Sequence, residues 1–259
     1  MFEPNQTAFD LRFRLFGTPI RVHPGFWLSV ILLGLPWVNI GFGFLALWVG
    51  RVFFSLLFHD FGHIIVGRFC GRPGSIVLYS LGGLRTGNDQ GLRRGQRIAI
   101  YLAGPVAGLL LYGIVHLVRD HLISQIPQQF LIQNPTLVQV IDRGTPMLLG
   151  INLIWSLLNL VPILPLDGGM IGMEILSVAS PRNGVRLALG LSMLLALLGA
   201  GYCLMEFSRN QPGPFGLHAG LSALLLGLLA FDCFWMLLAE NKRLKEESTR
   251  NQEGEDYQR

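Results

Sequence analysis

The sequence has few charged residues for its length. Only 14% of its 259 residues are Asp, Glu, Lys or Arg, while 51% are hydrophobic and the mean hydropathy is +0.48. Because a soluble domain of this size carries about a quarter charged residues, the deficit excludes an ordinary soluble domain and indicates a membrane protein. The net charge of +4 comes from basic residues dispersed between apolar runs, which fits loops facing anionic lipid and argues against a nucleic-acid surface.

Paired cysteines and a signal peptide are also absent. Cys70, Cys203 and Cys233 are far apart and none belongs to a CxxC pair, so we expect reduced structural residues and no disulfide framework. The N-terminal segment carries charges such as Asp10 and Arg12 without a continuous apolar region. The first hydrophobic run is therefore expected to remain in the protein as a membrane anchor.

Long apolar stretches predict an all-α polytopic membrane protein with about six transmembrane helices. The expected spans are residues 26–38, 42–67, 98–118, 146–166, 187–207 and 217–240, joined by a polar loop over residues 119–144. One integral membrane domain is expected over residues 1–240, followed by a polar cytosolic tail over residues 241–259. In the third span, Gly104 and Gly108 form a GxxxG pattern that should let it approach the helix bearing His59 closely.

Two short segments have the patterns of β-strands. Residues 11–16 alternate apolar and basic side chains, and residues 20–22 could pair with them after a turn at residues 17–19. Residues 75–85 begin with β-branched side chains and are interrupted by Gly82 and Gly83. A small β-hairpin or sheet element at the cytosolic membrane face is expected, because an exposed strand edge within lipid would leave backbone groups unpaired.

Two histidines, His59 and His63, stand four residues apart inside the second apolar run. On a helix this spacing puts both imidazoles on one face, about 6 Å apart along the axis, within reach of one metal ion. A bound cation would compensate for placing them and Asp60 in hydrocarbon, where such groups are costly. A pair of histidines hydrogen-bonded inside a helix bundle explains the spacing equally well.

A third metal ligand is suggested by Asp167. Catalytic zinc usually takes three protein ligands and keeps a fourth position open, so two histidines need a partner. Asp167 ends the fourth apolar stretch, where Pro162, Pro165 and two following glycines interrupt the helix and leave the carboxylate able to turn inward.

Together these residues resemble the site-2 protease family of intramembrane zinc metalloproteases. That family carries HExxH on one transmembrane helix and NxxPxxPxDG on a later one, and both patterns occur in this order, as residues 59–63 and 159–168. Family-like stretches at residues 81–84 and 103–108 lie between them, so the resemblance covers residues 11–169. It implies a zinc metalloendopeptidase that cleaves within or next to a transmembrane segment of a substrate protein, near the cytosolic face of the bilayer.

The resemblance also implies roles for individual residues. His59, His63 and Asp167 would hold Zn²⁺, and the carboxylate at position 60 would serve as general base. Gly82 and Gly83 could let the unwound substrate pair with a strand edge, although a plain connecting hairpin explains these glycines as well.

Asn159 has two open interpretations. Its side chain could hydrogen-bond the substrate strand or the developing oxyanion, and it could equally cap a helix.

The sequence departs from the family at Asp60, where the family has glutamate. Aspartate is one methylene shorter, which withdraws the carboxylate by about 1.5 Å. We therefore expect weak proteolysis that Asp60→Glu would increase, and the departure also favours an inactive pseudoprotease that acts as a membrane binding or scaffold protein. A transporter is a third class, favoured by Arg51 and Asp232 within apolar runs.

The basic residues predict an orientation. With six spans, sixteen basic residues fall on the side of both termini and three fall on the other, namely Arg119, Arg143 and Arg209. This asymmetry predicts that both termini lie in the cytoplasm. The expected location is the bacterial cytoplasmic membrane, as an integral multi-pass protein. His59 and Asp167 are then both expected near the cytosolic end of their spans.

Overall fold

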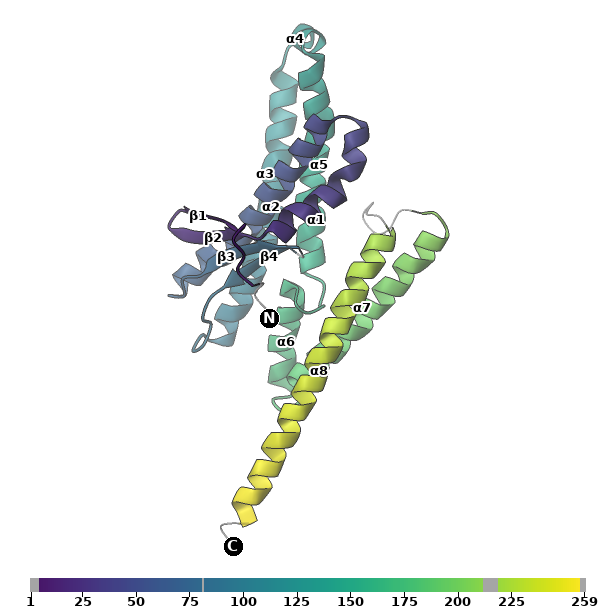
Figure 1. The fold of residues 1–259 in the computed structure, drawn as a ribbon. Coiled ribbons are helices and arrows are strands. Elements are labelled where there is room, and N and C mark those ends of the chain that lie inside the picture. Colours follow the sequence, from purple (N-terminus) through teal and green to yellow (C-terminus); the bar gives the residue numbers. More distant parts are fainter. Residues whose placement is uncertain (1–4, 81, 212–218, 257–259) are drawn as a thin grey trace. The chain divides into compact units, whose positions relative to one another are not determined.

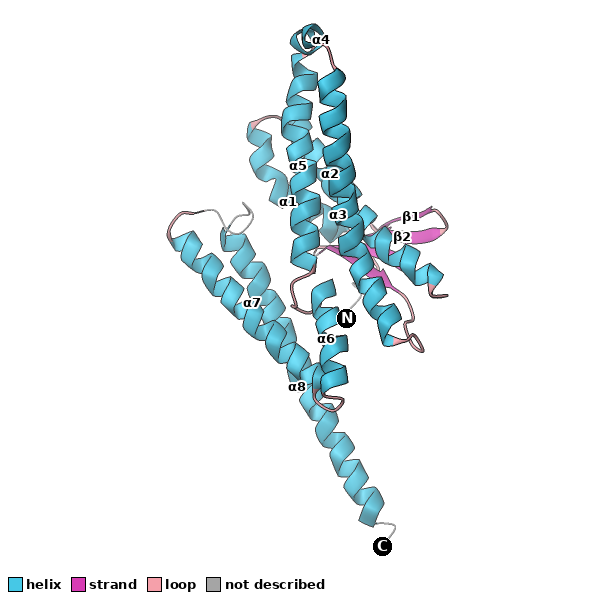
Figure 2. Ribbon diagram, turned by 180° about the vertical axis from the view of Figure 1, so that it is seen from behind, coloured by secondary structure: helices cyan, strands magenta, loops and turns pink. Residues whose placement is uncertain are grey.

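A computed structural model describes residues 5–80, 82–211 and 219–256, and the chain divides into two compact units (Figure 1). The first unit is Met1–Asn159 and the second is Leu160–Arg259. Helices make up most of both units, and the strands belong to the first (Figure 2). The expected fold class, mostly helical with a small sheet, is confirmed.

The first unit contains one four-stranded sheet in the order β1-β2-β3-β4. Its strands are β1 (Leu11–Leu15), β2 (Thr18–Val22), β3 (Ser75–Tyr79) and β4 (Gly82–Thr86). Phe16 and Gly17 join β1 to β2 with φ of 49° and 74°, the positive angles that a two-residue type I′ hairpin turn requires. The turn is therefore shorter than expected, because Thr18 and Pro19 belong to β2.

A parallel pairing of β2 with β3 unites the two predicted strand segments in one sheet. Between them the chain passes through α1 (Pro24–Gly34), a 3₁₀ helix, η1 (Leu35–Asn39), and α2 (Phe42–Phe69). One face of the sheet packs against α2 and α1 in a single apolar core. Its buried members include Ile20, Val22, Phe26, Leu56, Ile64, Ile76 and Leu78. This packing fixes the sheet beside the middle of α2.

Three further helices complete the first unit: α3 (Arg94–Gln125), α4 (Gln128–Gln133) and α5 (Pro135–Asn159). The predicted loop over residues 119–144 is wrong, because α3 and α5 extend through most of it. Its polar residues are the polar ends of long helices. The fourth predicted span is also displaced, since α5 ends at Asn159 and residues 160–166 are not helical.

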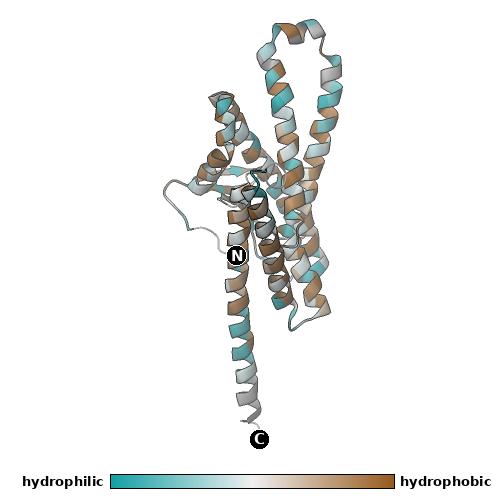
Figure 3. Cartoon of the chain, turned by 90° about the vertical axis from the view of Figure 1, so that its right-hand side faces the viewer, coloured by the Kyte–Doolittle hydropathy of each residue, from teal (hydrophilic) through white to brown (hydrophobic). Residues whose placement is uncertain are grey.

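The second unit consists of α6 (Asp167–Ala179), α7 (Gly184–Ser208) and α8 (Ala219–Asp256). Small side chains allow α7 and α8 to pack closely: Ala196 and Ala230 are buried together in one cluster, and Ala188 and Cys233 in another. The start of the predicted sixth span, residues 217 and 218, lies outside the described residues. Figure 3 shows hydrophilic residues gathered along the C-terminal part of α8, the region expected to be a polar tail.

Four helices of the described chain are long and apolar enough to cross a membrane: α2, α3, α7 and α8. Residues 24–39 form a shorter apolar helical segment. These helices support an integral membrane protein, as expected. The remaining two of the six predicted spans correspond to this short segment and to α5, and their crossing of the membrane stays a prediction.

Candidate metal centre

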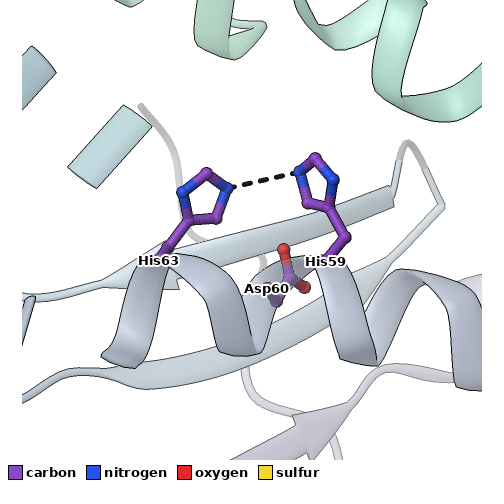
Figure 4. Close-up of side chains that lie close together, drawn as sticks. All are labelled: His59, Asp60 and His63. Carbon is purple, nitrogen blue, oxygen red and sulfur yellow. Dashed lines mark hydrogen bonds between the residues drawn. The ribbon is translucent and has the colours of Figure 1, made fainter. Parts of the chain in front are cut away.

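The two histidines of the HxxxH motif lie on one face of α2, and their imidazoles point to the same side (Figure 4). Both are buried, with exposed fractions of 4% for His59 and 6% for His63. Their Nε2 atoms are 3.3 Å apart and the ring planes are inclined by 77°. The spacing in the sequence has therefore produced a pair of converging nitrogen atoms.

A backbone carbonyl on α3 selects the tautomer of His63. The Nδ1 atom of His63 lies 2.6 Å from the carbonyl oxygen of Ile100, and a carbonyl can only accept a hydrogen bond. Nδ1 therefore carries the proton, and the lone pair of the neutral ring is on Nε2, the atom that faces His59. A second ring nitrogen bonded to a backbone carbonyl is the usual support of a metal-binding histidine.

The distance between the two Nε2 atoms fits a shared metal ion. Zinc binds imidazole nitrogen at 2.0–2.1 Å, so two nitrogens of a tetrahedral site lie about 3.3 Å apart, as these do. Because Nε2 of His63 is an acceptor, His59 is the donor of the hydrogen bond between the two rings. A metal ion bound by both nitrogens would replace the hydrogen atom of that bond. The hydrogen-bonded pair and the metal site therefore share one geometry.

Asp60 lies beside the two imidazoles and is almost completely buried, with 3% of its surface exposed. One ligand atom from each of His59, Asp60 and His63 can be chosen so that all three lie within 4.8 Å of one another. These three side chains could hold a metal ion, or the carboxylate could act on a water molecule next to it.

Glycines bring α3 against the histidine face of α2. A Cβ atom on Gly104 would lie 2.6 Å from Nε2 of His59 and would overlap the ring of His63, so only glycine fits there. On α2, a Cβ on Gly62 would likewise overlap the backbone of Ala103. The expected approach of the GxxxG helix to the helix bearing His59 is confirmed at Gly104, whereas Gly108 lies against Ser156 of α5.

Asp167 occupies the first turn of α6, in the second unit. The sequence placed it at the end of a span, but the prolines end the preceding helix early and Asp167 begins the next one. Residues 160–164 fold back over this turn so closely that a Cβ on Gly168 or on Gly169 would overlap their backbone. Asp167 itself is half-buried.

Side chains of α7 and α8 form hydrogen bonds with backbone groups of the non-helical segment before Asp167. The backbone N–H of Leu164 donates to Oγ of Ser192 at 3.0 Å, and Sγ of Cys233 lies 3.5 Å from the Leu164 carbonyl. Buried backbone groups outside a helix need such partners inside a membrane protein. The sequence held no signal for these two residues, because their partners are 28 and 69 positions away.

The other predicted residues are placed as follows. Asn159 is buried and its Nδ2 donates to the Trp155 carbonyl at 2.9 Å, one turn back in α5. Gly82 and Gly83 begin β4, an edge strand of the sheet, so a hairpin and a strand edge are both present. Leu81, the first residue of that family-like stretch, lies outside the described residues.

Comparisons with known proteins agree with this site. No protein-family model matches the chain. A Synechocystis protein with the provisional name zinc metalloprotease sll0528 is 30% identical over 245 residues, which cover 86% of this chain and 55% of that protein. The zinc metalloprotease MJ0392 of Methanocaldococcus jannaschii is 28% identical over 197 residues, covering 72% of this chain and 52% of that protein. The chain thus spans about half the length of the curated relatives it matches.

A solved structure shares the fold of this chain. The solved structure of the site-2 protease from Methanocaldococcus jannaschii matches with a TM-score of 0.60 and 22% identity, covering 86% of this chain and 94% of that one. The resemblance to the site-2 protease family is confirmed. The carbonyl of Ile100 is the part of the site that sequence reasoning missed, whereas the GxxxG pattern predicted the close approach of Gly104.

Two charged residues of the apolar helices lie apart from the His59, Asp60 and His63 group. The guanidinium of Arg51 donates to Sδ of Met147 at 3.7 Å and covers Gly144, so it is packed between α2 and α5. Asp232 lies on an exposed face of α8. The packing of Arg51 and the exposure of Asp232 give no support to the transporter alternative.

Proposed function

We propose that the chain is an intramembrane zinc metalloprotease that cleaves a peptide bond within or next to a transmembrane segment of a substrate protein. The observation that carries this proposal is the 3.3 Å distance between the Nε2 atoms of His59 and His63. The hydrogen bond from Nδ1 of His63 to the Ile100 carbonyl leaves Nε2 of His63 as an acceptor. His59 and His63 would hold Zn²⁺ together with Asp167 from the second motif. The names of the relatives support zinc and protease chemistry.

The chain's own groups supply the remaining chemistry. Zinc, when bound, polarises a carbonyl and lowers the pKa of water toward roughly 7. The Asp60 carboxylate would accept the proton of the attacking water and then give it to the leaving amine. Burial of Asp60 beside the imidazoles excludes bulk water, so this proton is passed within the site.

The sheet edge offers a place for the substrate. A peptide bond in an intact helix is inaccessible, so the substrate segment must unwind, and β4 could pair with it by strand addition. Gly82, with a φ of 128°, and Gly83 begin this edge strand and are candidate contacts for the substrate backbone, and Asn159 is a further candidate contact.

Cleavage of single-span substrates by the purified full chain tests the proposal, with and without a chelator. We expect cleavage that the chelator abolishes and added zinc restores. A protein that binds zinc through His59 and His63 but cleaves no substrate would be the pseudoprotease that Asp60 favours, and the proposal would be wrong.

We further propose that both termini are cytoplasmic, as the division of the basic residues predicts. Reporter fusions after Arg14, after Gln128 and after Lys245 test this orientation. Only the middle fusion should report the external side, and a cytoplasmic signal from it would contradict six spans.

A further inference from the structure

Gly83 lies on the face of β4 that points at α2. It pairs directly with Leu78 of β3, and residues that pair across strands share a face of the sheet. Leu78 is fully buried in the core against α2, so Gly83 faces the same helix. The residue of α2 that it meets is Asp60.

The carboxylate of Asp60 occupies the space that a side chain at position 83 would need. A Cβ atom built on Gly83 would lie 2.5 Å from Cγ and 2.6 Å from Oδ1 of Asp60 and would overlap Oδ2. These three atoms are its nearest neighbours. The carboxylate therefore rests directly on the backbone of β4.

The backbone of Gly83 does not itself require glycine. Gly82 has a left-handed φ of 128°, whereas Gly83 is not among the residues with positive φ. An alanine at position 83 would be unstrained in its backbone, and the three atoms nearest to its Cβ would all belong to Asp60. The contact with Asp60 thus accounts for glycine at this position.

We propose that Gly83 is a positioning residue that holds the carboxylate of residue 60, and that this contact makes aspartate, instead of the family's glutamate, the fitted base. The inference rests on the proposed proteolytic function for the role of Asp60, but not for the contact itself. Glutamate would extend the carboxylate by about 1.5 Å. Because the aspartate carboxylate already touches β4, the longer side chain must push the strand away or turn away from it. This reverses the expectation from stem length alone that Asp60→Glu increases activity.

The contact is tested by a double-mutant cycle on thermal stability. We expect Gly83→Ala to lower the melting temperature of the purified full chain by several degrees, because an added methyl group in a closely packed site displaces its neighbours. In the Asp60→Ala background the same change should have almost no effect, because the obstacle is gone. In the Asp60→Asn background, Gly83→Ala should lower the melting temperature as much as it does in the native chain, because the amide has the shape of the carboxylate.

Gly113→Ala is the matched control, since a Cβ there meets no atom within 4 Å. If Gly83→Ala does not fold alone but folds together with Asp60→Ala, the contact is established by that rescue. An equal loss of stability in all three backgrounds would overturn it.

The positioning role is tested by kinetics. A displacement of about 1 Å in a catalytic group can cost roughly 10²-fold, so Gly83→Ala should lower kcat by about that factor, with KM and zinc content unchanged. A rise in KM at constant kcat would mean that Gly83 contacts the substrate instead. Asp60→Glu should lower both kcat and the melting temperature, and an increase in kcat would overturn the fitted-aspartate part of the inference. If the native chain cleaves nothing, the proposed function fails, while the stability cycle still decides the contact.

Discussion

The histidine motif and the Asp167 motif differ in how their backbones are supported. The histidine motif lies in the middle of α2, a continuous helix of 28 residues whose backbone satisfies its own hydrogen bonds. The Asp167 motif follows a break in the helical structure, and its backbone depends on Ser192 and Cys233 for partners. A helix fixes the direction of its side chains by periodicity alone, whereas a broken segment must be held by the residues around it.

Substitution of both histidines should have the largest effect, because the continuous helix supplies two ligands at once. In the His59→Ala, His63→Ala variant we expect loss of zinc by elemental analysis and loss of cleavage to background. His116→Ala is the matched control, since His116 is half-exposed and pairs with Asp120 at 3.1 Å. Full zinc retention in the double variant would show that the metal binds elsewhere.

Asp60→Asn separates proton transfer from metal binding on the same helix. The amide keeps the volume of the side chain but cannot accept the proton, so cleavage should fall by about 10²- to 10⁴-fold while zinc remains bound. Single-turnover kinetics with elemental analysis would measure both. Asp232→Asn, an exposed carboxylate of α8, should leave cleavage unchanged. Unaltered cleavage in Asp60→Asn would remove Asp60 from the mechanism.

Asp167→Asn probes the broken segment through its proposed ligand. We expect zinc affinity to fall less than in either single histidine variant, because an amide oxygen can still coordinate but carries no charge. Competition against a chromogenic chelator would measure the affinity. An affinity equal to that of the native chain would exclude Asp167 as a ligand.

Ser192→Ala tests whether the broken segment depends on its supporting side chains. It leaves the buried N–H of Leu164 without its acceptor, which should cost about 1–3 kcal/mol of stability. Thermal unfolding measures this loss, and zinc affinity should weaken with it if the turn bearing Asp167 loosens. Ser208→Ala is the control, because its hydroxyl is exposed and bonds only its own helix. Equal melting temperatures for the two variants would contradict the dependence.

The smallest effect is expected far from both motifs, at Asp10. Hydrogen bonds from Thr7 and from the Arg21 guanidinium, 3.1 Å away, hold the pKa of Asp10 well below its ordinary value. A depressed pKa stabilises the fold above the unfolded value of about 3.9, and this contribution is lost as the pH falls through the folded pKa. Asp10→Asn should therefore lower the melting temperature slightly at pH 7, and the difference should shrink under acidic conditions. A pH-independent difference would assign the effect to packing.

Local patterns explain what could be predicted. The four-residue spacing of His59 and His63 predicts two side chains on one face of a helix. The alternation of apolar and basic residues over positions 11–16 predicts a strand. The polar loop prediction failed over residues 119–144 because helices continue beyond their apolar parts, where hydropathy no longer marks them. The prolines before Asp167 correctly marked a break, but they did not show that Asp167 begins a helix instead of ending one.

By itself, the sequence determined the membrane class, the resemblance to site-2 proteases and the histidine pair, because each depends on composition or on the spacing of residues in short motifs. Only the tertiary structure decided what surrounds that pair. The hydrogen bond of His63 to the Ile100 carbonyl joins residues 37 positions apart, and the contact of Gly83 with Asp60 joins residues 23 positions apart (83 − 60). Such contacts follow from how α2, α3 and the sheet pack together, and no local pattern records which atoms will meet.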